Sequence, residues 1–213
     1  MEEYIMSLIT RMTVKEEFRT SQESVSWHAH REAETLTDPD LYPILKNIIL
    51  SRQSKKDTDI RDAAYFIMGK LFLKVPSDEY CIFYIQQLEN ETNKYLVSSM
   101  LDWLCDIEIP LDADISPIIA CTKSDKWLIR YSAIKALGSS NTKESKETLA
   151  YFLNQTDDKK YKDEITYANA ALGRIGTLED IPLLEQHVKS RKWDVKDSAI
   201  YAIERIQQRE GKR

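Results

Sequence analysis

The sequence predicts an all-α protein, a right-handed α-solenoid in which about six helical hairpins form a single repeat domain over residues 1–213. Three observations predict it. A helical segment recurs about every 33 residues, apolar residues follow the 3.6-residue period of a helix, and only 5 Gly and 6 Pro are available for tight turns. Because one hairpin cannot bury its own apolar stripe, neighbouring hairpins are expected to stack.

The recurring segment is clearest where Trp127 aligns with Trp193 and Ala133 with Ala199. A central residue marks each copy, and these markers are Ala33, Ala64, Met100, Ala133, Ala168 and Ala199. Apolar residues stand four positions before most markers and three and four after most of them, as Ile129 does before Ala133. This spacing predicts that each marker lies on the buried face of the second helix of a hairpin.

The first helix of each hairpin is expected just before the marked one, at residues 2–18, 39–51, 77–89, 113–123, 143–155 and 178–190. Residues with oxygen-bearing side chains precede five of them and are expected to cap them, namely Asp38, Ser77, Asp112, Thr142 and Thr177. Pro43, Pro117 and Pro182 each follow a cap by five positions, so we expect them to remove an early hydrogen bond and bend their helices. The recurring glycines are expected to serve as C-caps.

The segment from Trp127 to Gly138 reads Trp-Leu-Ile-Arg-Tyr-Ser-Ala-Ile-Lys-Ala-Leu-Gly. It resembles the second helix of HEAT repeats, in particular the short bacterial HEAT-like units of the phycobilisome-lyase type, which read Trp-x-Val-Arg-x-x-Ala-x-x-Ala-Leu-Gly. The resemblance covers roughly residues 25–210 and is weakest at residues 92–106. It implies that the second helices line a concave face, and that Arg61, Arg130 and Lys196 pair with acidic groups of neighbouring repeats.

Positions two before and two after each marker lie opposite the apolar stripe at 100° per residue, so they are expected to face outward on that concave side. This outward row contains Arg31, Asp62, Phe66, Asp102, Tyr131, Lys135, Asp197 and Tyr201, together with Thr35, Ser98, Thr166 and Ala170. It has no single charge sign and includes three aromatic rings, which are frequent interface anchors. We therefore predict that the row binds a protein or peptide. Alternatively, the groove is shallow and the rings fold onto neighbouring repeats.

A second column, six positions before the marker, contains Trp27, Trp127 and Trp193. Such a column can be read as a stacking platform for bases or a flavin. Because it belongs to the repeat pattern itself, we favour rings that seal the turn between the two helices.

Catalytic and metal chemistry has no visible location in the sequence, so we predict a protein that is not an enzyme and has no cofactor. His28 and His30 are two residues apart and diverge by about 200° on a helix, so they do not converge on one metal ion. Cys81, Cys105 and Cys121 lie on apolar stretches without a CxxC pair, which indicates reduced packing cysteines. Phosphate loops, nucleophile elbows and HExxH motifs are absent, and paired acids near helix starts are explained by capping.

The net charge of −5 disfavours nucleic acid as a partner. No apolar run approaches the ~18 residues of a membrane span, and the first residues do not resemble a signal peptide, so a cytoplasmic protein is expected. The first interpretation is a scaffold or adaptor, and the main alternative is an immunity-type inhibitor that masks a basic toxin or nuclease. Its surface would be the acidic segment of Glu2, Glu3, Glu16, Glu17, Glu23, Glu32 and Glu34. Family resemblance leaves two further alternatives, a HEAT-like DNA glycosylase and a bilin-lyase-like protein.

Overall fold

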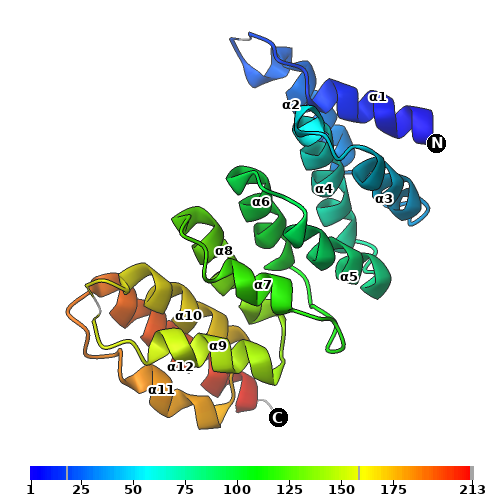
Figure 1. The fold of residues 1–213 in the computed structure, drawn as a ribbon. Helices are drawn as coiled ribbons and strands as arrows, with labels where there is room; N and C mark the ends of the chain where they lie inside the picture. The colour runs from blue at the N-terminus through cyan, green and yellow to red at the C-terminus, as the bar shows by residue number, and fades with distance from the viewer. Residues whose placement is uncertain (18, 158, 212–213) are drawn as a thin grey trace. The chain divides into compact units, whose positions relative to one another are not determined.

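The computed structural model describes residues 1–17, 19–157 and 159–211, and the regular secondary structure of these residues is entirely helical (Figure 1). The predicted all-α solenoid is therefore confirmed. The chain divides into two compact units, Met1–Tyr84 and Ile85–Arg213. The expectation of one domain over the whole chain stays a prediction.

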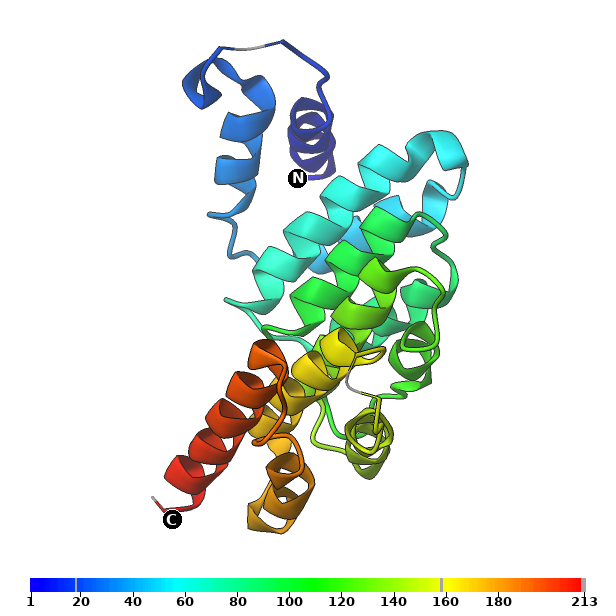
Figure 2. The ribbon, with the colours of Figure 1, turned by 90° about the vertical axis from the view of Figure 1, so that its left-hand side faces the viewer.

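The first unit contains α1 (Glu2–Met12), α2 (Val25–Ala33), α3 (Leu41–Ser51), α4 (Thr58–Phe72) and most of α5 (Asp78–Gln86). Helix α1 packs on α2, and α3 packs on α4, so each pair forms a hairpin (Figure 2). Their facing sides bury Leu8, Leu45 and Ile67 completely. Tyr42 stacks on Phe72 and donates its hydroxyl to the carbonyl of Val75 at 2.6 Å, which ties α3 to the end of α4.

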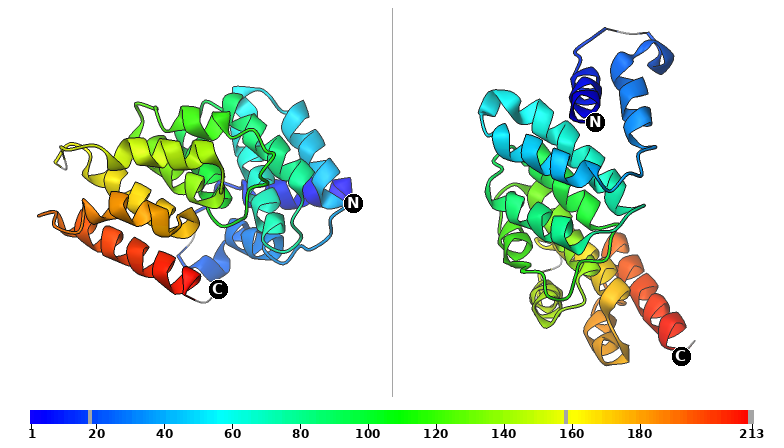
Figure 3. Two further views of the ribbon diagram at one scale, coloured as in Figure 1. Left: turned by 90° about the horizontal axis from the view of Figure 1, so that it is seen from below. Right: turned by 90° about the vertical axis from the view of Figure 1, so that its right-hand side faces the viewer.

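The second unit contains α6 (Lys94–Leu104), α7 (Ser116–Cys121), α8 (Trp127–Ala136), α9 (Lys143–Leu153), α10 (Lys162–Ile175), α11 (Ile181–Glu185) and α12 (Trp193–Glu210). The second helices pack in series, α6 on α8, α8 on α10 and α10 on α12. Each first helix packs on its own second helix, so α7 lies on α8, α9 on α10 and α11 on α12 (Figure 3). This is the hairpin stack that the repeat predicts.

The markers are confirmed as core residues. All six lie on or at the end of second helices and are completely buried, namely Ala33, Ala64, Met100, Ala133, Ala168 and Ala199. Small residues dominate these positions because close helix packing requires short side chains at the contact.

The first helices begin and end differently from the prediction. Helix α1 ends at Met12 instead of residue 18, and Phe18 lies outside the described residues. Helices α3, α7 and α11 begin at Leu41, Ser116 and Ile181. Each proline therefore lies in a first turn, where the N–H would have no helical partner. The prediction that Pro43, Pro117 and Pro182 remove a helical hydrogen bond was wrong.

Two of the predicted caps are found, and one is replaced by a neighbour. The Thr142 hydroxyl accepts the N–H of Ser145 at the start of α9. Before α11, Thr177 forms a capping box with Asp180, whose carboxylate accepts the N–H of Thr177 at 2.7 Å. At the start of α7 it is Asp114, rather than Asp112, that accepts the N–H of Ser116 at 2.9 Å. These carboxylates therefore have local structural partners.

The recurring glycines leave room for the neighbouring second helix, because they have no side chain. No described glycine has a positive φ, so the C-cap prediction was wrong for Gly138 and Gly173. A Cβ at Gly138 would lie 2.8 Å from the Cα of Ala171, and one at Gly173 would lie 2.8 Å from the Cα of Ala202. Glycine at this repeat position therefore lets two successive second helices approach each other closely.

Candidate functional site

On each second helix, the outward-row positions and the tryptophan position lie on one face. Positions six before, two before and two after a marker are four residues apart, so they share one helix face. We call this face of the second helices the second-helix stripe. It comprises Trp27 and Arg31 on α2, Asp62 and Phe66 on α4, Asp102 on α6, Trp127, Tyr131 and Lys135 on α8, and Trp193, Asp197 and Tyr201 on α12.

In the first unit, the stripe combines charged and aromatic side chains, and some of them contact one another. Arg31 is exposed, pairs with Glu34 at 2.6 Å, and has its guanidinium 5.4 Å from the centre of the Trp27 ring. Asp62 is exposed. Phe66 is half-buried, with its ring 5.0 Å from that of His30 in an edge-on contact. Phe66 therefore folds onto the preceding repeat, as the alternative interpretation predicts.

Tyr131 also contacts a neighbouring repeat. Its hydroxyl donates to the carboxylate of Asp163 at 3.2 Å, and its ring centre is 5.3 Å from that of Tyr167. Partial burial raises the pKa of Tyr131, and the charges of Glu164 and Asp163 raise it further. This ring is half-buried and held in place by α10.

Ser98 was expected on the outward row, but its side chain is buried and shares a hydrogen bond with the Ser132 hydroxyl at 2.9 Å. The prediction was wrong for this position because α6 and α8 pack closely there. A small hydroxyl can therefore lie inside that helix contact.

An ion pair joins two second helices along the stripe. The Lys135 ammonium lies 2.8 Å from the Asp102 carboxylate. Partial burial lowers the pKa of Lys135, but the hydrogen bond to Asp102 and the Asp102 charge together raise it above its ordinary value. The pair keeps both charged groups oriented at the surface of α6 and α8.

The exposed aromatic rings of the stripe in the second unit are Trp127, Trp193 and Tyr201, whose exposed fractions are 61%, 73% and 57%. The favoured reading, in which tryptophan rings seal the turn, was therefore wrong for Trp127 and Trp193. Each is the first residue of its helix, and helical side chains lean toward the N-terminal end. The rings of Trp127 and Trp193 therefore extend beyond the N-terminal end of their own helices and remain uncovered. Asp197 lies between Trp193 and Tyr201 on the same face and is half-buried.

The resemblance implies that Arg61, Arg130 and Lys196 pair with acidic groups of neighbouring repeats, and the structure shows this in part. Arg130 pairs with Glu164 of the next repeat at 2.8 Å, which confirms the pairing for this residue. Arg130 also donates to the carbonyl of Ser124 at 2.8 Å, and Arg61 donates to the carbonyl of Ser54 at 2.9 Å. The arginine at this position therefore also holds the loop before its own helix.

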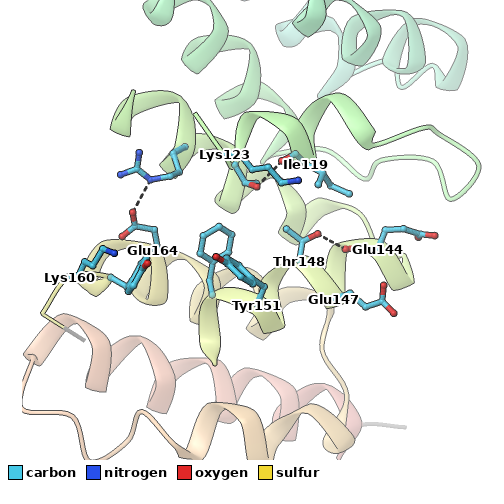
Figure 4. A pocket seen from close by; sticks show the side chains of 12 residues that line it. Ile119, Lys123, Glu144, Glu147, Thr148, Tyr151, Lys160 and Glu164 are labelled. Atoms are coloured by element: carbon cyan, nitrogen blue, oxygen red, sulfur yellow. Dashed lines mark hydrogen bonds and ion pairs between the residues drawn. The ribbon is translucent and has the colours of Figure 1, made fainter. Parts of the chain in front are cut away.

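A second surface feature lies on the other side of the hairpins. A groove of about 1030 Å³ separates α7 from α9, and Tyr151 of α9 lies in its middle (Figure 4). Sequence reasoning missed this groove. The available signal was Tyr151 on the outer face of α9, where it is 61% exposed.

The histidine and cysteine side chains, which are the candidate metal ligands and reactive groups, are either hydrogen-bonded to backbone carbonyls or at least partly buried. The ring of His28 donates to the carbonyl of Gln22 at 2.8 Å and that of His30 to the carbonyl of Ser26 at 2.7 Å, so they serve different carbonyls. Within residues 1–17, 19–157 and 159–211, no three His, Cys, Asp or Glu side chains are placed to hold a metal. Burial raises the pKa of Cys81 and of Cys105 to about 12, and that of Cys121 to about 11.

Several carboxylates of the acidic segment are occupied within the first unit. Glu32 accepts two hydrogen bonds from Arg11 and one from Tyr4, and the Arg11 hydrogen bonds lower its pKa. Glu34 pairs with Lys70 at 3.0 Å. The two glutamates therefore stabilise contacts between helices, and their charge is locally compensated.

The comparisons with known proteins identify the fold. A designed armadillo repeat protein aligns with 94% of this chain and 98% of its own chain, with a TM-score of 0.54 and 13% sequence identity. The chain has an armadillo-like helical-repeat fold. An engineered protein, with a TM-score of 0.49, 15% identity and coverage of 96% of this chain and 97% of that one, is a weaker match. Human deoxyhypusine hydroxylase in complex with glycerol has a TM-score of 0.48 and 15% identity, and covers 97% of this chain and 74% of that one.

No family model and no curated protein sequence matches the chain, so the HEAT pattern stays a resemblance. None of the helices in the described part of the chain combines the length and apolar character required to cross a bilayer.

Proposed function

We propose that the protein is a non-catalytic binding module, a HEAT-like scaffold or adaptor that holds a protein or peptide against the second-helix stripe. The observation that carries this proposal is the exposure of three large aromatic rings, Trp127, Trp193 and Tyr201, on one face of the second helices. A helix face that only meets water usually carries charged side chains there. Repeat solenoids use such extended faces for binding.

The rings have the properties of interface anchors. Burying a large aromatic ring removes on the order of 150 Å² from water, which contributes about 3–4 kcal/mol before the costs of association are subtracted. Each ring also carries a polar group at its edge, so it can donate a hydrogen bond to a partner. Trp and Tyr dominate interface hot spots for these reasons.

The surroundings of the rings support a preformed surface. Tyr131 is held by Asp163, and Lys135 is held by Asp102. Side chains that are already ordered lose less conformational entropy when a partner binds. The mixed charge of the stripe, with Asp102, Lys135 and Asp197, favours a partner surface that is itself mixed and partly apolar.

The inhibitor alternative gains no support from the acidic segment. Glu32 and Glu34 are paired within the first unit, and Glu16 accepts hydrogen bonds from the Ser24 hydroxyl and the Ser26 N–H. Carboxylates that are occupied in this way are poorly placed to attract a basic partner.

The test compares the double variant Trp193→Ala/Tyr201→Ala with a control, Leu111→Ala. Leu111 is 71% exposed in the loop before α7, so it does not lie on a second helix. Tagged proteins are used to purify partners from the native host, and bound proteins are quantified by mass spectrometry. We expect a partner captured by wild type and by Leu111→Ala to fall at least about tenfold with the double variant, since an anchor is worth 2 kcal/mol or more.

Circular dichroism serves as the folding control for both variants. If the double variant keeps its helicity and retains every partner, or if Leu111→Ala loses the same partners, the stripe is not the binding surface.

A further inference from the structure

The groove between α7 and α9 is a separate surface, formed by the first helices of two successive repeats. Helix α7 has 6 residues and α9 has 11, so the shorter helix leaves much of the α9 surface uncovered. The groove measures about 1030 Å³ and is also lined by the start of α10. It is larger than most small-molecule sites, which lie at roughly 300–1,000 Å³.

The middle of the groove is apolar. Ile119 of α7 lies on one wall, and Tyr151 and Phe152 of α9 lie on the other. Phe152 is 5% exposed, and its ring meets that of Tyr151 edge-on at 5.2 Å. Because Tyr151 is 61% exposed, this supported ring offers a ready contact for an apolar side chain.

The two ends of the groove have opposite charge. Glu144 and Glu147 lie at one end, and Lys160 lies at the other beyond Tyr151 (Figure 4). Lys123 follows α7 and lies beside Ile119 on the wall opposite Tyr151, away from Lys160 (Figure 4). Arg130 and Glu164 also line the groove, but they pair with each other at 2.8 Å and compensate each other's charge.

Lys160 keeps its charge at neutral pH. The hydrogen bond to Tyr161 raises the pKa of Lys160, and the carboxylate of Asp157 is occupied by the N–H groups of Lys159 and Lys160 at 3.1 and 3.0 Å. At the other end, Glu147 makes an exposed contact with Lys143 at 3.5 Å. Exposed ion pairs of this kind contribute little, so the Glu147 carboxylate can exchange Lys143 for another cation.

The distances match an extended chain. Glu144 and Tyr151 are seven residues apart on one helix, which is about 10 Å along its axis. About three residues of extended peptide span that length. A segment lying along the groove can therefore place one side chain at Tyr151 and others at both charged ends.

We propose that this groove binds an extended peptide segment of a partner protein, with an apolar side chain against Tyr151, a carboxylate toward Lys160, and a basic side chain toward Glu144 and Glu147. The opposite charges of the two ends select a segment with one acidic and one basic flank. This site is distinct from the second-helix stripe, because none of its lining residues belongs to the stripe.

The test uses synthetic fluorescein-labelled peptides of about twelve residues, long enough to span the groove. Each has a central Leu-Tyr pair, two to four spacer residues on either side, and two charged residues at each end. One set has an Asp pair and a Lys pair at opposite ends, in both chain directions. The second set has Lys pairs at both ends, and the third has Asp pairs at both ends. Binding is measured by fluorescence anisotropy at low salt.

We expect wild type to bind a mixed-charge peptide at least about tenfold more tightly than either control set. Lys160→Glu should shift the preference to the peptides with Lys at both ends. Glu144→Lys/Glu147→Lys should shift it to the peptides with Asp at both ends. Tyr151→Ala should weaken the binding of all sets about tenfold, and its exposed position allows the variant to fold.

Trp193→Ala/Tyr201→Ala is the matched control and should bind the peptides as wild type does. This result separates a failure of the groove from a failure of the second-helix stripe. The proposal is overturned if no mixed-charge peptide binds, if all three sets bind equally, or if the charge-reversal variants keep the preference of wild type.

Discussion

The variant Gly173→Ala tests why the repeat has glycine at this position. Either α10 and α12 approach too closely for a side chain, or the higher helix propensity of alanine outweighs that contact and stabilises the protein. Gly173 lies inside α10, where replacing glycine by alanine normally stabilises a helix by about 1 kcal/mol. In this structure the added Cβ would lie 2.8 Å from the Cα and 2.9 Å from the Cβ of Ala202 on α12. The two considerations therefore predict changes of opposite sign.

The size of the expected stability loss depends on which atom of Ala202 the added Cβ would contact. A side-chain atom could rotate away, but the Cα of Ala202 belongs to the backbone, so α10 and α12 must move apart. Overpacking of this kind costs about 1–3 kcal/mol, and a backbone obstacle places it in the upper part of that range. After subtracting about 1 kcal/mol for propensity, we expect a net loss of about 1–2 kcal/mol. This corresponds to a melting temperature lower by about 3–6 °C.

The assay is urea and thermal unfolding followed by far-ultraviolet circular dichroism. Ala170→Gly is the matched control, because Ala170 is exposed on the same helix and loses only propensity, about 1 kcal/mol. Gly138→Ala repeats the experiment at the equivalent position, where the nearest atom is the Cα of Ala171 at 2.8 Å. A Gly173→Ala protein more stable than wild type would refute the reasoning, since propensity would then outweigh the contact.

Two further predictions concern buried polar groups. Arg130→Met removes the partner of Glu164, whose side chain is only 7% exposed. It should lower the free energy of unfolding by about 3 kcal/mol, because the Glu164 charge would remain buried and unpaired. A loss below about 0.5 kcal/mol in urea titrations would contradict the role of this pair. Cys81, Cys105 and Cys121 should react slowly with a thiol reagent in the folded protein and rapidly in urea, because burial raises their pKa values. Their contribution to stability is complete below the unfolded thiol pKa of about 8.5 and is lost as the pH rises toward the folded values; rapid labelling of all three native thiols would refute this.

Much of the fold could be predicted because its signal is local. The spacing around Ala133 is contained within eight neighbouring positions, so the sequence indicates the buried face of α8 without reference to any other helix. Helix starts were less accessible. Pro117 is compatible both with a first turn and with a bend, and the difference depends on where α7 begins in the packed structure.

The site shows the opposite balance. Tyr131 and Tyr201 both belong to the outward row, two positions before one marker and two positions after another, yet Tyr131 is half-buried against Tyr167 and Tyr201 is 57% exposed. The sequence around each ring does not distinguish them, because the contacts of Tyr131 come from the following repeat. The groove at Tyr151 is likewise formed by two helices that are separate in the chain.

The sequence by itself determined the hairpin repeat, its period and its buried positions, since helical periodicity expresses the burial of each helix along the chain. Only the tertiary structure decided which outward rings are exposed, why Gly173 is glycine, and where a groove opens between α7 and α9. The physical reason is that exposure and close approach depend on atoms about one repeat away in the chain, and a local pattern contains no information about their positions.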